Sequence, residues 1–350
     1  MSTIRDVAKL AGVGVATASR ALSGNGSVAE DTIARVRSAA ERLDYRPSSI
    51  ARALSLRRSG AIGVYVPSFD GAFYSSILSS VDEVLRAAGR HMIAANGCGH
   101  GSMRQEALDG IDFLLDRDCD GLLIASHSLT DDDIAGLLQR RPGTVIVNRT
   151  VPGHEDRCFS VDHELAGVLA ARALMQQGHR EIATIAGPDD APDNAARMRG
   201  FYAELARHDI LVRPEHQCGG TFHFSTGDQA TRRLMPAIRG EVTGASRVTA
   251  LFVANDLMAM AAISSLTLAG LRVPDDVSVL GYDDSAFARY TSPPLTTVRV
   301  PITVVSADGC RLLLNECYDA RLPVQRGHLA EVIWRGTVAA GPHAPLAFDR

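Results

Sequence analysis

Side chains that can contact the edges of DNA bases are concentrated in one short segment near the amino terminus. In residues 15–22, the apolar side chains of Ala18, Ala21 and Leu22 would share one face of a helix. The opposite face would carry Val15, Ala16, Thr17, Ser19 and Arg20. An alanine can contact a thymine methyl group, and an arginine can donate two hydrogen bonds to guanine. A helix with this exposed face is suited to the major groove of DNA.

Two further helices must hold that segment in place. An apolar stripe at i, i+3, i+4 and i+7 predicts a preceding helix, and its members are Ile4, Val7, Ala8 and Ala11. Gly12 can adopt the left-handed conformation that ends such a helix. A later helix would begin at Glu30-Asp31 and turn Ile33, Val36, Ala40 and Leu43 inward. The sequence therefore predicts an all-α helix-turn-helix domain over residues 1–46.

A second set of polar and aromatic side chains follows the ends of predicted strands. In open α/β sheets, ligands bind at the carboxyl ends of the strands. Each such residue alone is most often a loop cap or a solvated charge, but a set of loops ending in acids, amides, arginine and aromatic rings indicates a polar cleft. Carboxylates and amides beside a ring suit neutral sugar hydroxyls. The candidate effector-binding residues are Asp70, Phe73, Tyr74, Asn148, Asp162, Asp193, Arg197, Phe222, Asn255, Asp256 and Asp283.

The elements that position these loops alternate between strand and helix from Gly60 onward. Apolar strands are predicted at 61–66, 91–95, 121–124 and 144–147, with helices at 73–88, 104–115 and 131–138. The pattern then restarts, with strands at 182–186, 249–253 and 277–280 and helices at 165–177, 194–206, 226–234 and 257–268. Continuous apolar runs between amphipathic helices predict two parallel-sheet lobes in series.

The segment between these parts, residues 47–59, is a candidate linker helix. Pro47 precedes it, and Ile50 and Leu54 would share one face. A helix this short is marginal by itself, so we expect it to be disordered until something packs on it. An ordinary linker is the alternative interpretation.

The distribution of charge separates the two parts. The chain has 350 residues and a net charge of −4, but residues 1–60 carry ten Lys or Arg against five Asp or Glu, which makes that segment +5 and the remainder −9. A basic end on an acidic body is expected of a DNA-binding domain joined to a soluble ligand-binding domain. The six cysteines show no C-x-x-C pair, and no targeting segment or membrane span is evident, which together predict a cytoplasmic protein with reduced thiols.

Several local motifs resemble those of the LacI/GalR transcription regulators. They are 3–24, Tyr45-Arg46-Pro47, Ala51-Arg52-Ala53-Leu54, 197–201, Ala254-Asn255-Asp256 and 281–284, within a resemblance that covers about 340 residues. It implies a two-lobed periplasmic-binding-protein-like body and a hinge helix that pairs with its dimer mate in the minor groove, where Leu54 would act as a wedge. We also expect DNA contacts from Thr3 and Arg52.

The resemblance also implies the boundaries of the domains. The helix-turn-helix domain would span 1–46, the hinge helix and linker 47–59, and the effector-binding and dimerisation domain 60–350. Within that domain, the first lobe would comprise about 60–161 and 295–322, and the second about 162–294 and 323–341. Residues 341–350 contain two prolines and no leucine heptad, so the expected assembly is a homodimer rather than a tetramer.

Two positions depart from the family pattern. Gly14 stands where most relatives have a serine before the recognition helix, which removes a hydroxyl that could bind phosphate. His163 stands where an asparagine often follows the aspartate. We expect His163 to cap the following helix, with a role in tuning the pocket as the alternative. The other histidines, including His127, His154 and His179, show no metal-ligand spacing.

These observations predict a sequence-specific, sugar-responsive regulator that represses carbohydrate uptake or catabolism genes. Its partners would be a double-stranded DNA operator with an imperfect palindrome, a sugar effector and a second copy of the chain, with no cofactor and no metal. The alternatives are a transport-type sugar-binding protein of the same fold and a regulator that uses a corepressor. An enzyme is disfavoured, because Gly12-Val13-Gly14 lacks the strand and third glycine of a dinucleotide site and no catalytic motif is present.

Overall fold

A computed structural model describes residues 2–23, 28–45, 58–97, 99, 101–244 and 246–348. The chain divides into two compact units, Met1–Ala61 with Arg117–Asp120, and Ile62–Asp116 with Gly121–Arg350. The second unit is the α/β body. Within the described residues, no helix is both long and apolar enough to span a lipid bilayer.

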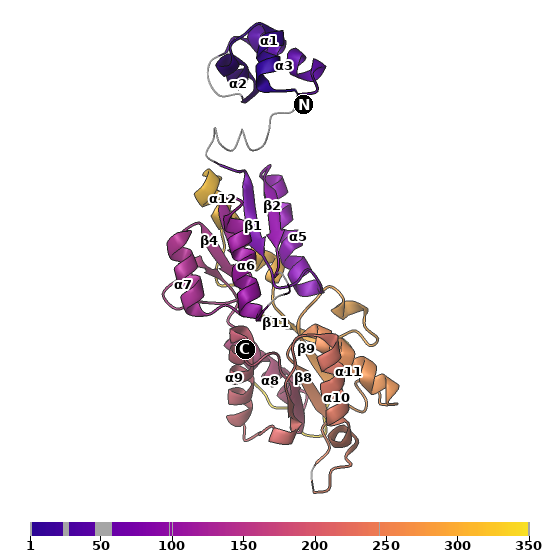
Figure 1. The fold of residues 1–350 in the computed structure, drawn as a ribbon. Helices are drawn as coiled ribbons and strands as arrows, with labels where there is room; N and C mark the ends of the chain where they lie inside the picture. The colour runs from indigo at the N-terminus through magenta and orange to yellow at the C-terminus, as the bar shows by residue number, and fades with distance from the viewer. Residues whose placement is uncertain are drawn as a thin grey trace. The chain divides into compact units, whose positions relative to one another are not determined.

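The amino-terminal unit contains a module of three helices, α1 (Ile4–Ala11), α2 (Val15–Ser23) and α3 (Glu30–Arg42) (Figure 1). Its core is made mostly of small side chains, and Val7, Ala18 and Val36 are fully buried. Small core side chains let short helices pack closely. Gly12 ends α1 with a φ of 66°, as its position predicted.

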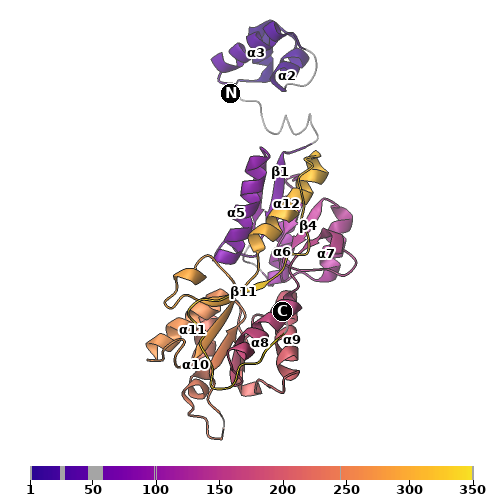
Figure 2. The ribbon, with the colours of Figure 1, turned by 180° about the vertical axis from the view of Figure 1, so that it is seen from behind.

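The first lobe of the body is a sheet with the strand order β2-β1-β3-β4-β5. Its strands are β1 (Ala61–Tyr65), β2 (His91–Ala95), β3 (Gly121–Ile124), β4 (Thr144–Val147) and β5 (Cys158–Phe159). Its helices are α5 (Ala72–Ala87), α6 (Met103–Leu115), α7 (Asp131–Arg140) and α12 (Ile302–Tyr318). β1, β3, β4 and β5 pair in parallel. Both views of the ribbon place α12 with this lobe, although it comes from near the end of the chain (Figures 1 and 2).

The second lobe is a sheet with the strand order β11-β10-β9-β8-β6-β7. Its strands are β6 (Ile182–Ile185), β7 (Gln217–Cys218), β8 (Ala250–Val253), β9 (Ser278–Asp283), β10 (Thr296–Arg299) and β11 (Glu331–Ile333). Its helices are α8 (His163–Gln176), α9 (Pro192–Ala206), α10 (Phe224–Arg239) and α11 (Asp256–Leu268). Among the described strand pairs of this sheet, β11 pairs antiparallel with β10, and the other pairs are parallel. Short 3-10 turns lie at Glu155–Arg157, Pro214–His216 and Ala288–Tyr290.

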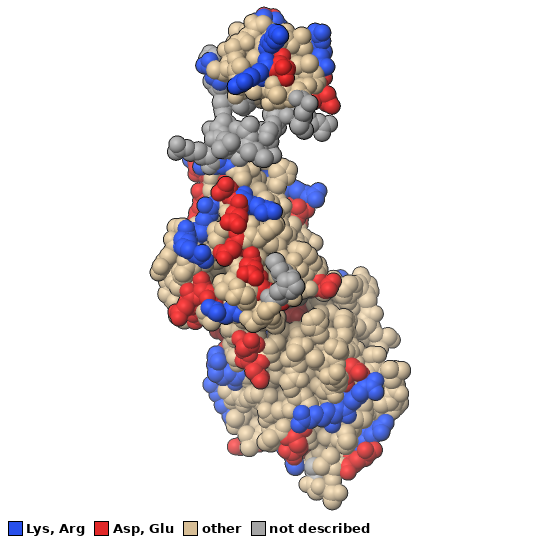
Figure 3. Space-filling view, viewed as in Figure 1, with Lys and Arg blue, Asp and Glu red and all other residues tan. Residues whose placement is uncertain are grey.

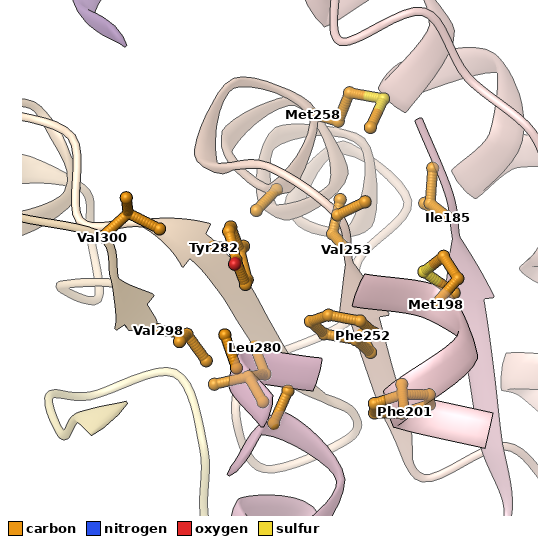
Figure 4. Packing of buried hydrophobic residues seen from close by; sticks show 14 of the residues in the cluster. Ile185, Met198, Phe201, Phe252, Val253, Met258, Leu280, Tyr282, Val298 and Val300 are labelled. Atoms are coloured by element: carbon orange, nitrogen blue, oxygen red, sulfur yellow. The ribbon is translucent and has the colours of Figure 1, made fainter. Parts of the chain in front are cut away.

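The core of the second lobe carries the frame of the functional site (Figure 4). Phe201 of α9 stacks on Phe252 of β8, with ring centroids 4.3 Å apart and an interplanar angle of 19°. Both rings are fully buried, as is Tyr282 at the end of β9. Because α9 and β9 are fixed by this packing, the side chains at their ends have defined positions.

One predicted boundary is wrong. The first lobe was expected to resume at residue 295, but β10 (Thr296–Arg299) pairs in parallel with β9 in the second sheet. The return to the first lobe therefore comes between β10 and α12. The sequence gives little sign of β10, because Thr296 and Thr297 interrupt the apolar pattern; both are fully buried, and their hydroxyl groups form hydrogen bonds. β5 and β7 also went unpredicted, since strands of two residues are too short for a periodic signal.

Candidate functional site

The exposed face of α2 carries the side chains that the sequence suggested for base contacts. Val15 is 45% exposed, and Ala16, Ser19 and Arg20 are exposed, whereas Thr17 is half-buried. Ala18 and Ala21 point into the core, as predicted. Arg20 Nε donates a hydrogen bond to the carbonyl oxygen of Ala16 at 3.3 Å, which holds the guanidinium against its own helix. Basic side chains are exposed on this module (Figure 3).

Of the other predicted DNA contacts, the structure describes only Thr3. Thr3 lies at the start of α1, where its backbone N–H and its Oγ1 each donate to Asp6 Oδ2 at 2.8 Å. These hydrogen bonds hold the pKa of Asp6 below its usual value. Thr3 is exposed and has a structural role as a cap. Arg52 and Leu54, and with them the predicted hinge helix, lie outside the described residues.

A cavity of about 190 Å³ lies between the two lobes of the body. It gathers most of the residues that the sequence placed at the carboxyl ends of strands. The first lobe contributes Asp70, Phe73, Tyr74 and Asn148, and the second contributes Asp193, Arg197, Phe222, Asn255 and Asp283. Asp162 and Asp256 do not line it.

Arg197, on α9, is the central charged group of the cavity. Its side chain is 2% exposed, and its guanidinium donates hydrogen bonds to the Ala254 carbonyl oxygen and, at 3.2 Å, to Asp193 Oδ2. The guanidinium carbon also lies 3.6 Å from the centroid of the Tyr282 ring. These contacts compensate a cation that would be costly to bury alone. Burial raises the pKa of the nearby Asp283 carboxyl well above its usual value, and Arg197 opposes that rise.

Phe222 forms a preset wall of the cavity. Its φ is 63°, a left-handed conformation that costs a bulky residue roughly 1–3 kcal/mol. Asn255 Nδ2 donates to the Phe222 carbonyl oxygen at 3.1 Å, while Asn255 Oδ1 caps α11 by accepting from Met258 N at 3.0 Å. Gly187 leaves room for the ring, because a Cβ there would lie 2.3 Å from it. The hydrogen bond from Asn255 therefore holds the backbone of Phe222, and the lack of a side chain at Gly187 leaves space for its ring.

The two predicted residues outside the cavity have structural roles instead. Asp256 is fully buried; its carboxylate accepts from Thr297 Oγ1 and from the backbone N–H of Ser285, each at 2.6 Å. Burial raises its pKa to about 7. Asp256 thus supports the loop that follows Asp283. Asp162 is exposed and caps α8, accepting from Leu165 N at 2.9 Å.

The prediction that His163 caps α8 is wrong, because Asp162 does so. His163 is buried, with Nδ1 2.8 Å from the Tyr282 hydroxyl and Nε2 3.2 Å from the Asn148 carbonyl oxygen. Burial lowers its pKa to about 4, so the ring is neutral at pH 7. His163 therefore connects the second lobe, through Tyr282, to the first, through Asn148.

Sequence reasoning missed several residues of the cavity. His127, Thr221, His223 and Leu257 line it as well. His127 lies shortly after β3, so the rule that ligands bind at carboxyl ends of strands, applied to that strand, would have found it. The spacing of the histidines, which indicates no metal site, does not reveal this position.

Comparison with known proteins places both sites in a family context. Residues 3–48 match bacterial regulatory proteins of the lacI family, and residues 171–338 match a periplasmic binding protein-like domain. The chain is 33% identical to the HTH-type transcriptional regulator GalR of Escherichia coli (strain K12), over 92% of this chain and 91% of that protein. It is 32% identical to the repressor PurR of Pectobacterium carotovorum, over 98% of each.

Solved structures of LacI-family regulators have a similar fold. The lac repressor dimer bound to operator and the anti-inducer ONPF aligns with a TM-score of 0.83 and 26% identity, covering 97% of this chain and 99% of that one. The regulator CelR in complex with cellobiose aligns with a TM-score of 0.67 and 30% identity, covering 96% and 100%. A helix-turn-helix module joined to a two-lobed binding domain defines a DNA-binding transcription regulator, not an enzyme. The chain belongs to the LacI family of bacterial regulatory proteins.

Proposed function

We propose that this regulator is a homodimeric repressor of carbohydrate genes, which binds an imperfect palindrome in the cytoplasm and releases it when a sugar enters the interlobe cavity. The observation that carries the proposal is the cavity itself, in which acids, amides and aromatic rings from both lobes face one space. Such a lining suits hydroxyl groups. In each protomer, α2 would be the recognition helix and would contact one half-site of the operator through its exposed face.

The cavity's position supports a switch. A ligand can shift a conformational equilibrium only through a difference in its affinity for the two states. A sugar that contacts Tyr74 and Asn148 on one lobe and Arg197 and Asp283 on the other would favour one lobe arrangement over another. In the proposed mechanism, that arrangement prevents the hinge segments of the two protomers from pairing. A corepressor would favour the opposite arrangement.

Operator affinity with and without effector tests the proposal. The operator would be isolated by selecting fragments of genomic DNA with the full-length protein, and its symmetry read by footprinting. Effectors would be found by thermal shift, since a ligand at 100 times its dissociation constant adds roughly 2.7 kcal/mol of stability. We expect a palindromic footprint that a sugar abolishes. Tighter DNA binding with the sugar would indicate that the sugar is a corepressor. If the selection yields no specific DNA site, the DNA-binding assignment of α2 is overturned.

A further inference from the structure

One carboxylate holds the chain at the point where it enters β1. Asp120 Oδ1 accepts a hydrogen bond from the Ser59 backbone N–H at 2.8 Å, and Asp120 Oδ2 accepts one from the Gly60 N–H at 2.7 Å. These lengths are typical of hydrogen bonds to an ionised acceptor, which are roughly twice as strong as neutral ones. Each carboxylate oxygen therefore binds one of two successive N–H groups.

The backbone around these two residues is arranged for this contact. Gly60 has a φ of 75°, a conformation that residues with a Cβ rarely adopt. Ser59 Oγ accepts from the Ala61 N–H at 3.3 Å, and the Asp120 N–H in turn donates to the Ala61 carbonyl oxygen at 2.8 Å. Successive N–H groups that converge in a turn form a concavity suited to an anion. We call Ser59, Gly60, Ala61 and Asp120 the linker anchor.

The loop that carries Asp120 is itself well packed. It runs from the end of α6 to the start of β3, and residues 117–120 belong to the same compact unit as Met1–Ala61. Cys119, next to Asp120 in this loop, is only 2% exposed. From the following residue of each segment onward, β1 and β3 pair in parallel. The linker anchor therefore continues the pairing of these strands back to residue 59.

A fixed end of the chain matters for a protein that binds two half-sites. In the proposed dimer, binding of the second half-site is intramolecular, and its effective concentration depends on the length and stiffness of the joining segments. One residue spans at most roughly 3.3–3.6 Å, and one base pair adds about 3.4 Å to the length of the DNA. Releasing Ser59 and Gly60 would therefore change the reach of the joining segment on the scale of one or two base pairs.

Resting on the proposed function, we infer that Asp120 is a positioning residue for operator recognition. By holding Ser59 and Gly60, it fixes the point from which the joining segment starts, and so limits the spacing between half-sites that the dimer accepts. Asp120 acts through the chain that it holds and not by contact with DNA. A merely structural role would have another signature, because a loss of folded protein lowers the apparent affinity for every spacing by the same factor.

Operators of altered spacing test this inference. The selected operator would be remade with one or two base pairs inserted or removed at its centre, and each DNA titrated with the full-length protein at one fixed salt concentration. The wild type should bind the selected spacing best and lose at least about tenfold in affinity for a change of one base pair. Asp120→Ala should bind the selected spacing about tenfold more weakly and lose only about threefold for the same change.

Two further variants sharpen that comparison. Asp116→Ala removes an exposed acid at the end of α6, just before the loop that carries Asp120, and should follow the wild type at every spacing. Asp120→Asn keeps one acceptor oxygen for one of the two N–H groups, so its spacing profile should lie between those of the wild type and Asp120→Ala. If Asp120→Ala fails to fold, the comparison is made with Asp120→Asn.

The outcomes separate this inference from the proposed function. Parallel spacing profiles for the wild type and Asp120→Ala overturn the inference and leave the proposed function standing. A wild type that tolerates every spacing equally does the same, as does a profile for Asp116→Ala that is as flat as that of Asp120→Ala. A wild type that selects no DNA site overturns the proposed function, and this inference with it.

Hydrogen–deuterium exchange tests the linker anchor without DNA. Amide groups that are held by a hydrogen bond exchange only when that bond opens. In the free full-length protein, peptides that contain Ser59 and Gly60 should exchange faster in Asp120→Ala than in the wild type, whereas Asp116→Ala should leave their exchange unchanged. Equal exchange in the wild type and Asp120→Ala would show that the carboxylate does not hold this segment, and would overturn the inference whatever the DNA titrations give.

Discussion

The helical module and the α/β body place their functional side chains in opposite environments. On α2, Val15, Ser19 and Arg20 project from a small core and contribute little to it. In the body, Arg197 and Asn255 are buried and also hold the fold together. If the exposed face of α2 reads DNA as proposed, DNA recognition can change by substitution at the surface with little cost in stability. In the proposed effector site, by contrast, the same side chains also contribute to the free energy of folding.

The largest test of this contrast is Arg197→Ala. Removing the guanidinium leaves Asp193 and Asp283 without their cation and frees the Ala254 carbonyl oxygen. Breaking a buried pair from one side destabilises a protein by about 3–5 kcal/mol. We expect urea unfolding to show a loss of this size, and operator affinity measured under native conditions to become insensitive to effector.

Arg199→Ala is the matched control for that experiment. Arg199 lies on the same helix, but its ion pair with Glu164 is exposed, with side chains 60% and 49% accessible. Exposed pairs contribute at most about 1 kcal/mol. Equal destabilisation by the two variants, or a normal effector response in Arg197→Ala, would contradict the idea that the same side chain serves both the effector site and the stability of the fold.

His163→Asn tests whether the link between the lobes depends on pH. In the folded protein, burial lowers the pKa of His163 to about 4, against about 6.5 when unfolded. Below pH 6.5 the unfolded chain binds the proton more readily than the folded chain does. The stability that the neutral, buried His163 contributes at pH 7 is therefore lost as the pH falls from 6.5 to 4. The full shift corresponds to a loss on the order of 3 kcal/mol.

The measurement is the difference in unfolding free energy between wild type and His163→Asn, from pH 7 to pH 4. Asp256 has a folded pKa of about 7, so its contribution to the unfolding free energy has the opposite sign and increases as the pH falls. Because Asp256 is present in both proteins, this contribution cancels in the difference. We expect the wild type to lose its advantage over the variant as the pH falls. Parallel curves for the two proteins would show that His163 titrates normally in the folded state.

Arg20→Ala probes the exposed side of the comparison. One base contact by arginine contributes about 1–3 kcal/mol, so operator affinity should fall by that amount and preference at one base of each half-site should relax. The unfolding free energy and effector binding should stay at wild-type values, because Arg20 is exposed. Arg37→Ala on α3 removes an exposed charge of the same type and should leave the sequence preference intact. Unchanged footprints for Arg20→Ala would remove α2 from base recognition.

The sequence revealed the elements with strong periodicity and the loops at the carboxyl ends of strands. It predicted β2, β3 and β4 to the residue, and nine cavity residues from several loops. It did not separate residues that line the cavity from those one position away. Asp256 and Asn255 are adjacent and both polar, yet only Asn255 reaches the cavity. That distinction depends on Thr297 and Ser285, whose approach to Asp256 is set by tertiary packing.

The smallest expected effect is at Gly14, immediately before α2. Its carbonyl oxygen accepts the first helical hydrogen bond from Ala18 N at 2.9 Å, and a Cβ there would meet nothing within 4 Å. A serine at this N-cap position should stabilise the module by only a few tenths of a kcal/mol relative to glycine, whereas an alanine should destabilise it. The serine hydroxyl would also offer the DNA backbone a further donor. We expect thermal unfolding to rank Gly14→Ser above wild type and wild type above Gly14→Ala, with operator affinity highest in Gly14→Ser. An alanine variant as stable as the serine variant would show that Gly14 does not act as a cap, and the exposed helix would then depend on packing alone.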